Sequence, residues 1–475
     1  MMINKLLILS AFVLISVGRL EANHQNNKPR IIVTTDGEAD DRASMVRFLL
    51  TCNEFDVEGI INSSSQFHWV GGEGWNAFHD VSWVKEYIDL YAKVYKNLLL
   101  HDPNYPSPEL LLSKWKIGNI DGIGEDTKRT EGAELIVKVL LDKSDSRPVW
   151  IQAWGGCNTI SRALKIIQQD YPERMAEAAE KMRLFLIWEQ DETYQNYIRP
   201  NWEEYNIPTI ISDQFDCIAY IWPKVLPSDV KKYFEADWMT ENILTGHGQL
   251  CDEYENNNGA FNAEGDTPAF LHSIPTGLRS MESPSNGGWA GRYVKVRNNV
   301  WMDPLPDSTY TYPTGQWGFH NSWSKKMEHD TEADKVAIRT NYFKPIWRWL
   351  PDVQNDFAAR ADWCVKDYSS ANHHPVVQLK NTPLNIEVKA GSKIKLDASA
   401  TSDPDKDKLT FTWWNYTEAG TYNGKKIPEA MSAKTKITVP EDALPGNTIH
   451  MICEVSDNGT PSLTRYQRVI ITVIE

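Results

Sequence analysis

Residues 34–41 read Thr34-Thr35-Asp36-Gly37-Glu38-Ala39-Asp40-Asp41 and directly follow the apolar run Ile31-Ile32-Val33. An apolar run, a glycine among acids and then a helical pattern predict a strand, a loop and a helix start. Because open α/β sheets hold ligands at the carboxyl ends of strands, these acids are expected at a binding site. Carboxylates crowded there repel one another unless protons or a cation compensate them, and a hard divalent cation is the simplest solution. In the alternative interpretation, Asp40 and Asp41 only favour the helix N-terminus through its dipole.

Alternating strand and helix patterns continue from residue 30 to about residue 349. Strands are expected at residues 31–34, 57–61, 149–154, 183–187 and 208–211, and helices at residues 42–52, 130–141 and 159–168. Thr130 opens the helix expected at residues 130–141, which carries Glu131 and Glu134 in its first turn. The alternation predicts an α/β fold with a mostly parallel sheet flanked by helices.

The pattern changes after about residue 375. Short runs separated by turn residues predict strands at residues 384–388, 393–396, 409–413, 449–455 and 469–474. Alternation in the run 449–455 puts Ile449, Met451, Cys453 and Val455 on one face. These features predict an all-β, immunoglobulin-like sandwich of about 100 residues. The expected organisation is a signal peptide at 1–22, an α/β domain at 28–367, a linker at 368–375 and the sandwich at 376–475.

The N-terminus and the charge indicate where the protein acts. Residues 1–22 combine Lys5, an apolar stretch and small residues, which is typical of a secretory signal peptide and too short for a membrane span. No later stretch is long enough to be a transmembrane segment, so a secreted or periplasmic protein is expected. A formal net charge of −15 disfavours nucleic acid and anionic membranes as partners and suits a neutral substrate with bound cations. The sequence does not indicate the oligomeric state.

The cysteines and tryptophans indicate which metal sites, disulfides and ligands to expect. The six cysteines show no C-x-x-C spacing, which argues against a zinc site or a disulfide framework. One or two incidental disulfides remain an open alternative in an oxidising compartment. The 19 tryptophans weakly favour a carbohydrate ligand, because exposed tryptophan faces stack on sugar rings.

Four stretches in this order resemble the nucleoside hydrolase superfamily, and more closely its exported branch of nucleoside-hydrolase-like, or cellulose-binding-like, proteins. They are residues 36–41, 154–159 (WGGCNT), 264–271 (EGDTPAFL) and 287–293 (GGWAGRY), which together span most of residues 30–300. The resemblance implies the fold of that superfamily, a single calcium ion at the bottom of a deep pocket, and hydrolysis at an anomeric carbon.

The resemblance also implies a role for each acid. Asp36, Asp41 and Asp266 would hold the calcium ion, together with a backbone carbonyl in the neighbourhood of Asn158. Asp40 would be the catalytic base that activates a calcium-bound water. General chemistry is compatible with these roles: calcium takes about six to eight oxygens, which leaves room for water and a sugar diol. A bound cation lowers the pKa of water, and an adjacent carboxylate can then accept the proton.

Departures from the nucleoside hydrolase signature bear on the substrate. Thr34 stands where the signature has Asp, and Gly37-Glu38 where it has Pro-Gly, so Glu38 is an additional acid of unassigned role. The asparagine-rich ribose pocket of the family is not clearly matched. The candidate substrate-binding residues are Gln66, His68, Glu189, Asp191 and Trp289. Trp69, Trp75 and Trp188 also lie near the motif loops, with core packing as the alternative for each tryptophan.

Each remaining candidate has a structural alternative. Asp266 precedes Thr267-Pro268, a common helix start, so it would also serve as a helix cap. Asn158 follows a predicted strand and could equally be a plain N-cap. His68, His247 and His272 are candidate general acids for the leaving group, although a lone histidine is more often structural.

A loop of the sandwich carries a further acidic motif. Residues 402–407 (SDPDKD) resemble the start of an EF-hand loop, but Lys408 replaces the glycine at the sixth loop position and Trp414 the glutamate at the twelfth. Residues 396–407, together with residues 455–459, instead resemble polycystic-kidney-disease-type or cadherin-like modules, which are usually spacers or adhesion units. A second calcium ion in this loop is an alternative that the sequence leaves open.

The sequence thus predicts an exported calcium-dependent hydrolase of a glycosidic bond in a glycan or glycoside. Two alternatives stay open. One is a nucleoside N-ribohydrolase, and the other is a non-catalytic carbohydrate-binding protein whose calcium ion only supports the fold.

Overall fold

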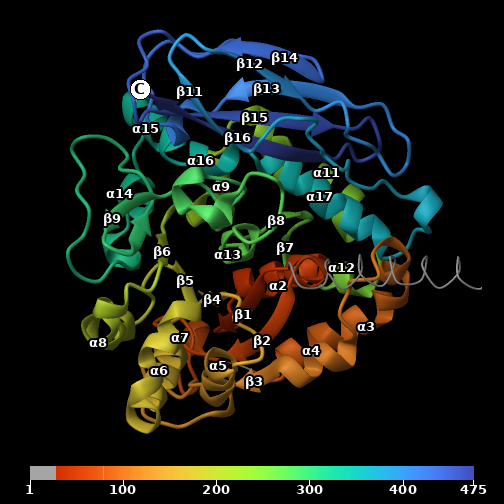
Figure 1. Ribbon diagram of the computed structural model, residues 1–475. Helices are drawn as coiled ribbons and strands as arrows, with labels where there is room; N and C mark the ends of the chain where they lie inside the picture. Colours follow the sequence, from red (N-terminus) through yellow and green to blue (C-terminus); the bar gives the residue numbers. More distant parts are fainter. Residues whose placement is uncertain (1–27, 79) are drawn as a thin grey trace, which may run out of the picture.

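The computed structural model describes residues 28–78 and 80–475 (Figure 1). The signal peptide expected at residues 1–22 lies outside these residues. In the part of the chain that is described, no helix is both long and apolar enough to cross a membrane.

An eight-stranded sheet forms the centre of the α/β part, with the strand order β3-β2-β1-β4-β5-β6-β10-β9. Its strands are β1 (Arg30–Thr35), β2 (Asp56–Asn62), β3 (Trp115–Ile117), β4 (Val149–Ala153), β5 (Met182–Ile187), β6 (Thr209–Ser212), β9 (Val294–Arg297) and β10 (Val300–Met302). All neighbouring strands pair in parallel except β9, which is antiparallel to β10. The predicted mostly parallel sheet is therefore confirmed.

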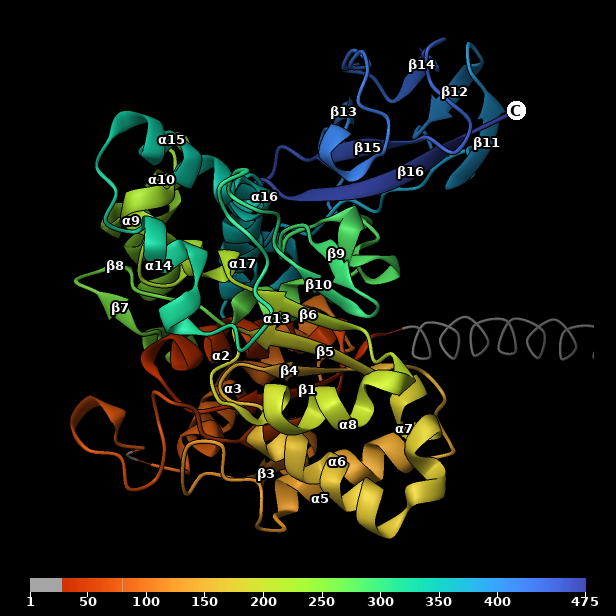
Figure 2. The same ribbon diagram turned by 90° about the vertical axis from the view of Figure 1, so that its left-hand side faces the viewer.

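Helices cover both faces of this sheet (Figures 1 and 2). On one side lie α2 (Ala39–Thr51), α13 (Thr267–Leu271) and α17 (Leu350–Trp363), and on the other α5 (Glu131–Leu141), α6 (Asn158–Asp170) and α7 (Met175–Lys181). The α/β part also contains α3 (Trp83–His101), α4 (Pro108–Lys114), α8 (Arg199–Trp202), α9 (Trp222–Val225), α10 (Ser228–Lys231), α11 (Ala236–Met239), α12 (Gln249–Asp252), α14 (Trp323–Met327), α15 (Ala333–Tyr342) and α16 (Lys344–Trp347). Every residue of β1 is buried, as expected for a strand covered on both faces.

The strand order places a switch point between β1 and β4. The chain moves from β1 through β2 to β3 on one side of the sheet, and from β4 through β6 on the other. Ligands of such sheets bind outside the carboxyl ends of the two central strands, where the loops diverge. Asp36 follows β1 at this point, and Gly155 follows β4. A Cβ atom on Gly155 would lie 2.9 Å from Cβ of Asp36, so only glycine permits this close approach.

The C-terminal strands form the predicted sandwich. A four-stranded sheet has the order β11-β16-β15-β13, and a two-stranded sheet pairs β12 with β14. The strands are β11 (Asn385–Lys389), β12 (Lys393–Asp397), β13 (Thr410–Asn415), β14 (Lys434–Thr438), β15 (Thr448–Ser456) and β16 (Thr464–Ile474). Ile449, Met451, Cys453 and Val455 share its core, as their alternation predicts. The expected boundaries of the linker, at residues 368 and 375, stay predictions.

The outer face of the sandwich packs against the α/β part, near α16 and α17 (Figures 1 and 2). Ile452 and Tyr466, from β15 and β16, belong to the large core of the α/β part. The buried guanidinium of Arg468 donates to the carbonyl oxygens of Leu278 (2.6 Å) and Gly287 (2.9 Å). The central residues of β15, from Ile449 to Cys453, are buried on both faces, so the sandwich is packed against the α/β part, unlike the usual spacer arrangement of such modules.

All six cysteines lie in the described residues, and all are buried and free. Cys251 and Cys364 are close enough for one thiol to raise the pKa of the other. The incidental disulfides that the sequence left open are therefore not formed in this structure.

Candidate functional site

The loop between β1 and α2 brings three aspartates to the carboxyl edge of the sheet. Asp36 follows β1, and Asp40 and Asp41 lie in the first turn of α2. All three are buried, with exposed fractions of 1%, 8% and 2%. Gly37 has a φ of +79°, and a Cβ atom there would lie 2.8 Å from the indole nitrogen of Trp83. The predicted strand, loop and helix start are therefore present, and the glycine is what allows the turn.

A fourth aspartate from the other end of the domain joins this loop. Asp40, Asp41 and Asp266 each offer a carboxylate oxygen, and these atoms all lie within 4.8 Å of one another. Asp266 is the N-cap residue of α13, yet its side chain accepts no capping hydrogen bond. One of its oxygens, Oδ2, is buried and has no hydrogen-bond partner. Helix capping therefore does not account for this side chain, whereas coordination of a cation would.

The candidate metal ligands lie in two neighbouring groups that share no residue. Asp36, Glu38 and His68 form the second group, also with ligand atoms within 4.8 Å of one another. The charge of Asp36 raises the pKa of both Asp41 and Asp266, in addition to burial, so the two groups form one electrostatic cluster. We call Asp36, Asp40, Asp41 and Asp266 the carboxylate cluster.

In the part of the chain that the structure describes, no lysine or arginine forms an ion pair with an aspartate of the carboxylate cluster. Burial and then the charge of Asp36 raise the pKa of Asp40 to about 7. Arg47, on α2, is engaged with Glu264 at 2.6 Å, and Arg42 with Glu255 at 2.8 Å. Buried carboxylates of this kind hold protons or a cation. With the partnerless Oδ2 atom of Asp36 as well, the donor set fits a hard divalent cation.

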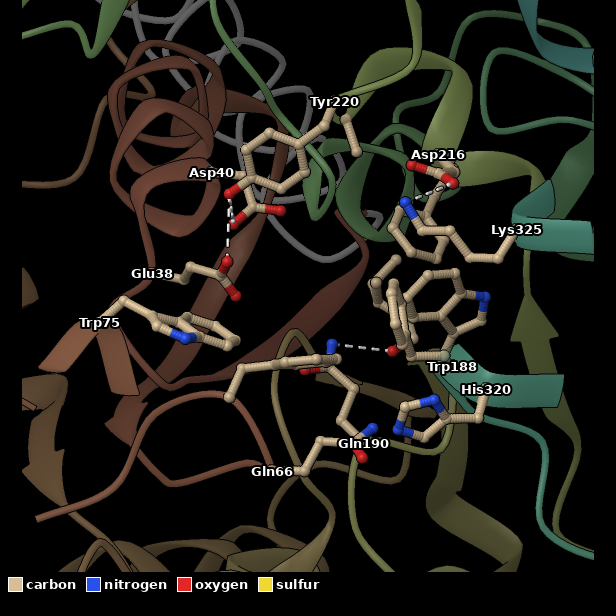
Figure 3. A pocket seen from close by; sticks show the side chains of 15 residues that line it. Glu38, Asp40, Gln66, Trp75, Trp188, Gln190, Asp216, Tyr220, His320 and Lys325 are labelled. Atoms are coloured by element: carbon tan, nitrogen blue, oxygen red, sulfur yellow. Dashed lines mark hydrogen bonds and ion pairs between the residues drawn. The ribbon is translucent and has the colours of Figure 1, made fainter. Parts of the chain in front are cut away.

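A cavity of about 370 Å³ opens beside the carboxylate cluster (Figure 3). Its volume lies in the range of small-molecule binding sites, about 300–1,000 Å³. Asp40 and Glu38 form part of its wall, and the aromatic lining consists of Phe67, Trp75, Trp188, Phe215, Tyr220 and Phe319. We call this space the aromatic cavity. A second cavity of about 350 Å³ lies next to it and shares Glu38 and Trp75.

Tyr220 connects the carboxylate cluster to the aromatic cavity. Its hydroxyl group can donate to Oδ1 of Asp40 at 3.3 Å or to Oε1 of Glu38 at 3.2 Å (Figure 3). Burial and the two acids raise the pKa of Tyr220, so the phenol stays protonated and acts as a donor. Tyr220 was not predicted as a site residue, because the apolar residues around it in the sequence do not indicate a polar role.

The opposite wall of the aromatic cavity carries an ion pair and a strained tryptophan. Nζ of Lys325 lies 3.4 Å from Oδ2 of Asp216, and burial raises the pKa of this aspartate to about 6 (Figure 3). Trp188 has a φ of +58°, a region that bulky side chains rarely adopt, and its indole donates to Asp213 at 2.7 Å. Backbone strain of this kind concentrates at ligand sites.

Two of the five predicted substrate-binding residues reach a cavity, and two others do not. Gln66 lines the aromatic cavity, and His68 lines the second cavity. Glu189 is instead buried and accepts a hydrogen bond from the amide of Trp317 at 2.9 Å. Asp191 accepts hydrogen bonds from Thr193 and from the amide of Asn158. These two acids hold loops together, while Gln190 between them lines the aromatic cavity.

The structure does not bring Asn158 or Trp289 to the carboxylate cluster or to either cavity. The side-chain amide of Asn158 donates to Ser64 at 2.8 Å and to the carbonyl of Asn119 at 2.7 Å. Its oxygen accepts from the amide of Thr159, and Cys157 rather than Asn158 is the N-cap residue of α6. Trp289 is 1% exposed and packs against the guanidinium of Arg465. Both side chains are therefore engaged within the protein, while the backbone carbonyl expected near Asn158 as a calcium ligand stays a prediction.

Of the three candidate histidines, only His68 lies at a cavity. His272 is buried against Trp150, and burial lowers its pKa to about 3. His247 lies 3.3 Å from Asp362. A histidine that the sequence analysis did not select, His320, lines the aromatic cavity.

Comparisons with known proteins agree with this architecture. Residues 30–293 match the family model described as cellulose-binding Sde182, nucleoside hydrolase-like domain, and residues 393–473 match that of the cellulose-binding protein Sde0182, C-terminal domain. No curated protein matches the chain. Among solved structures, a nucleoside hydrolase-related hypothetical protein from Saccharophagus degradans, associated with carbohydrate metabolism, aligns with a TM-score of 0.74 and 31% identity. The alignment covers 94% of this chain and 100% of that chain.

A more distant structure is the type III effector protein XopQ complexed with adenosine diphosphate ribose. It aligns with a TM-score of 0.31 and 8% identity, over 68% of this chain and 95% of that chain, which is a low structural similarity. The family model covers more than half of the chain, and the Saccharophagus degradans protein aligns with nearly all of it. This chain therefore belongs to the family of the cellulose-binding Sde182, nucleoside hydrolase-like domain, and it also carries the Sde0182 C-terminal domain.

Proposed function

We propose that this protein hydrolyses a glycosidic bond in a glycan or glycoside, and that it works outside the cytoplasm with a calcium ion at the carboxylate cluster. One observation carries the proposal: Asp40 belongs both to the carboxylate cluster and to the wall of the aromatic cavity. A single buried carboxylate is thus adjacent to a cation-binding donor set and to a space for a small ligand.

We propose calcium as the cation, because carboxylate oxygens are ligands that a hard divalent cation prefers. Asp36, Asp41 and Asp266 would hold it, since each contributes carboxylate oxygens and two of them have a buried oxygen without a partner. When bound, calcium would supply positive charge that lowers the pKa of water and attracts sugar hydroxyls.

Asp40 is the residue that we propose as the base. It would take one proton from the attacking water, whose oxygen bonds to the anomeric carbon as the bond to the leaving group breaks, and the leaving oxygen gains one proton. The hydroxyl of Tyr220, 3.3 Å from Oδ1, would orient the carboxylate toward the aromatic cavity. Negative charge beside the anomeric carbon favours the oxocarbenium-like transition state of such reactions.

A carbohydrate substrate is supported by the cavity wall and by the relatives. Trp75 is 64% exposed and lines both cavities, so its ring face is available to stack on a sugar. The family is described as cellulose-binding, and the Saccharophagus degradans protein is associated with carbohydrate metabolism.

Two alternatives follow from the same site. A nucleoside N-ribohydrolase would use the aromatic wall for the base, but the cavity offers the glutamines Gln66 and Gln190 instead of an asparagine-rich ribose pocket. A non-catalytic carbohydrate-binding protein would agree with the description of the family. In that case the carboxylate cluster would bind its cation only to support the fold.

A substrate screen separates these functions. Calcium-loaded and chelator-treated protein would be incubated with cello-oligosaccharides, aryl glycosides and nucleosides, and released sugar would be measured. We expect sugar release from a glycan or glycoside that the chelator abolishes and calcium restores. Release from nucleosides alone would support the ribohydrolase. Binding without release from any compound would support the non-catalytic protein.

A further inference from the structure

Three oxygen atoms without hydrogen-bond partners lie in and beside two loops of the sandwich. They are Oδ1 of Asn372, Oδ2 of Asp403 and Oδ2 of Asp457, and all three atoms are buried. Asn372 and Asp457 are each 5% exposed as residues. A buried oxygen acceptor without a donor destabilises the fold, and more so when it is charged, so three together require an explanation.

These side chains come from separate segments that the structure brings together. Asn372 lies on the segment after α17, Asp403 between β12 and β13, and Asp457 after β15. The side-chain amide of Asn372 donates to Oδ1 of Asp457 at 3.1 Å, and the amide of Lys408 donates to Asn458 at 2.6 Å. Lys408 lies on the loop that follows Asp403, and Asn458 is next to Asp457, so this hydrogen bond joins the two loops.

The orientation of the Asn372 amide is fixed by its two acceptors. Its nitrogen donates to Asp457 and to the carbonyl oxygen of Pro461, at 3.1 and 2.7 Å. Both contacts require the nitrogen, which leaves the oxygen as the unpaired acceptor. Asp457 uses its Oδ1 atom for the amides of Gly459 and Leu463, and its Oδ2 atom has no partner.

The basic groups nearby do not neutralise these carboxylates. His373 pairs with Asp405, with Nδ1 at 3.0 Å, and its backbone amide donates to the same carboxylate. Lys406 and Lys408 are exposed to solvent. Among the described residues, neither Asp403 nor Asp457 forms an ion pair, in contrast to Asp405, and the Oδ2 atom of each has no hydrogen-bond partner.

We propose that a hard divalent cation of the calcium class binds between Asn372, Asp403 and Asp457. Two carboxylates and an amide oxygen are ligands that such a cation prefers, and water and backbone carbonyls would complete its shell. The site shares no residue with the carboxylate cluster and does not depend on the proposed hydrolase. It also differs from an EF-hand, because its ligands come from three segments instead of one loop.

Such a cation would connect the segment that leads from α17 into the sandwich to two loops of the sandwich. The carbonyl oxygen of Asn372 accepts a hydrogen bond from the indole of Trp363, on α17, at 2.9 Å. The proposed ion would therefore connect the last helix of the α/β part to the loops that precede β13 and β16.

Calcium titration of the metal-free full chain tests the proposal. Asp403→Asn is the sharpest variant, since it retains Oδ1, which accepts from the amides of Asp405 and Asp407 at 2.9 Å, and neutralises the unpaired oxygen. We expect Asp403→Asn to bind one calcium ion fewer than the wild type in isothermal titration calorimetry. Its melting temperature should also rise less with calcium. Glu387→Gln, an exposed acid of β11, is the matched control and should behave like the wild type.

A second variant separates this site from the carboxylate cluster and keeps the test decisive if Asp403→Asn does not fold. Asp266→Asn removes a ligand of the carboxylate cluster only, so it should still bind one calcium ion that chelator removes. Equal calcium stoichiometry in Asp403→Asn and the wild type would overturn the proposal. A complete loss of calcium binding in Asp266→Asn would overturn it as well.

Discussion

Replacing Asp40 by Asn should stabilise the metal-free protein, and this gain should grow with pH. The pKa of Asp40 is about 7 in the folded protein and 3.8 in its ordinary state. Below pH 3.8 both states hold the proton, and above pH 7 neither does. Between these values the folded state binds more protons than the unfolded state, so the free energy of unfolding falls as the pH rises. The asparagine side chain does not titrate, so the free energy of unfolding of Asp40→Asn does not fall with pH for this reason.

The size of the effect follows from the same values. Between pH 5 and the folded-state pKa of about 7, the free energy of unfolding of the wild type falls by about 1.4 kcal/mol for each pH unit. From pH 5 to pH 8 the total loss is therefore on the order of 3 kcal/mol. Buried neutral histidines act in the opposite direction, because burial lowers the pKa of His272, His374 and His450 to about 3. Since both proteins contain them, their contribution cancels in the difference.

Urea unfolding followed by tryptophan fluorescence would measure this difference. In chelator, the free energy of unfolding of Asp40→Asn minus that of the wild type should increase by about 3 kcal/mol between pH 5 and pH 8. Saturating calcium should remove the increase, because a cation favours the charged carboxylate. A difference that is the same at pH 5 and pH 8 in chelator would refute the argument that Asp40 lies in an uncompensated acidic cluster.

Three further substitutions probe the cavity, the interface and the loop after β4. Trp75→Ala should weaken carbohydrate binding about tenfold in calorimetry by removing a stacking face, whereas Tyr171→Ala, an exposed aromatic outside the cavities, should not. Arg468→Met should lower the free energy of unfolding by about 2–5 kcal/mol in urea, since two buried carbonyl oxygens lose their donor; a loss below 0.5 kcal/mol would contradict this role. Gly156→Ala should lower the melting temperature strongly, because its Cβ atom would lie 2.2 Å from Asp191.

The elements of the α/β part were predictable because their signals are local. Buried β1 and β4 appear in the sequence as short apolar runs, and the hydroxyl of Thr130 caps α5 by accepting from the amide of Ala133. The family-like spacing of acids also located the β1–α2 loop correctly. What the pattern could not show is that β15 is buried on both faces, since its outer face packs against a different part of the chain.

The aromatic cavity was only partly predictable, because its wall comes from loops far apart in sequence. Trp75 and Trp188 were candidates from their position near motifs, but Tyr220 and Lys325 reach the cavity through tertiary packing alone. Conversely, polar residues after strands do not all serve a ligand. The carboxylate of Glu189 accepts a hydrogen bond from the backbone amide of Trp317 in a neighbouring loop. No local sequence signal distinguishes this structural role from substrate binding.

We infer that Asp40 acts as the base in hydrolysis of a bound glycoside, and a comparison of the wild type with Asp40→Asn tests this role. Calcium-loaded wild type and Asp40→Asn would be given the same glycoside, with sugar release and equilibrium binding measured on each. We expect turnover to fall by a factor of about 10²–10⁴ in the variant, while the dissociation constant of the carbohydrate changes little. Equal binding by both proteins without turnover by the wild type, or equal turnover by both, would contradict it.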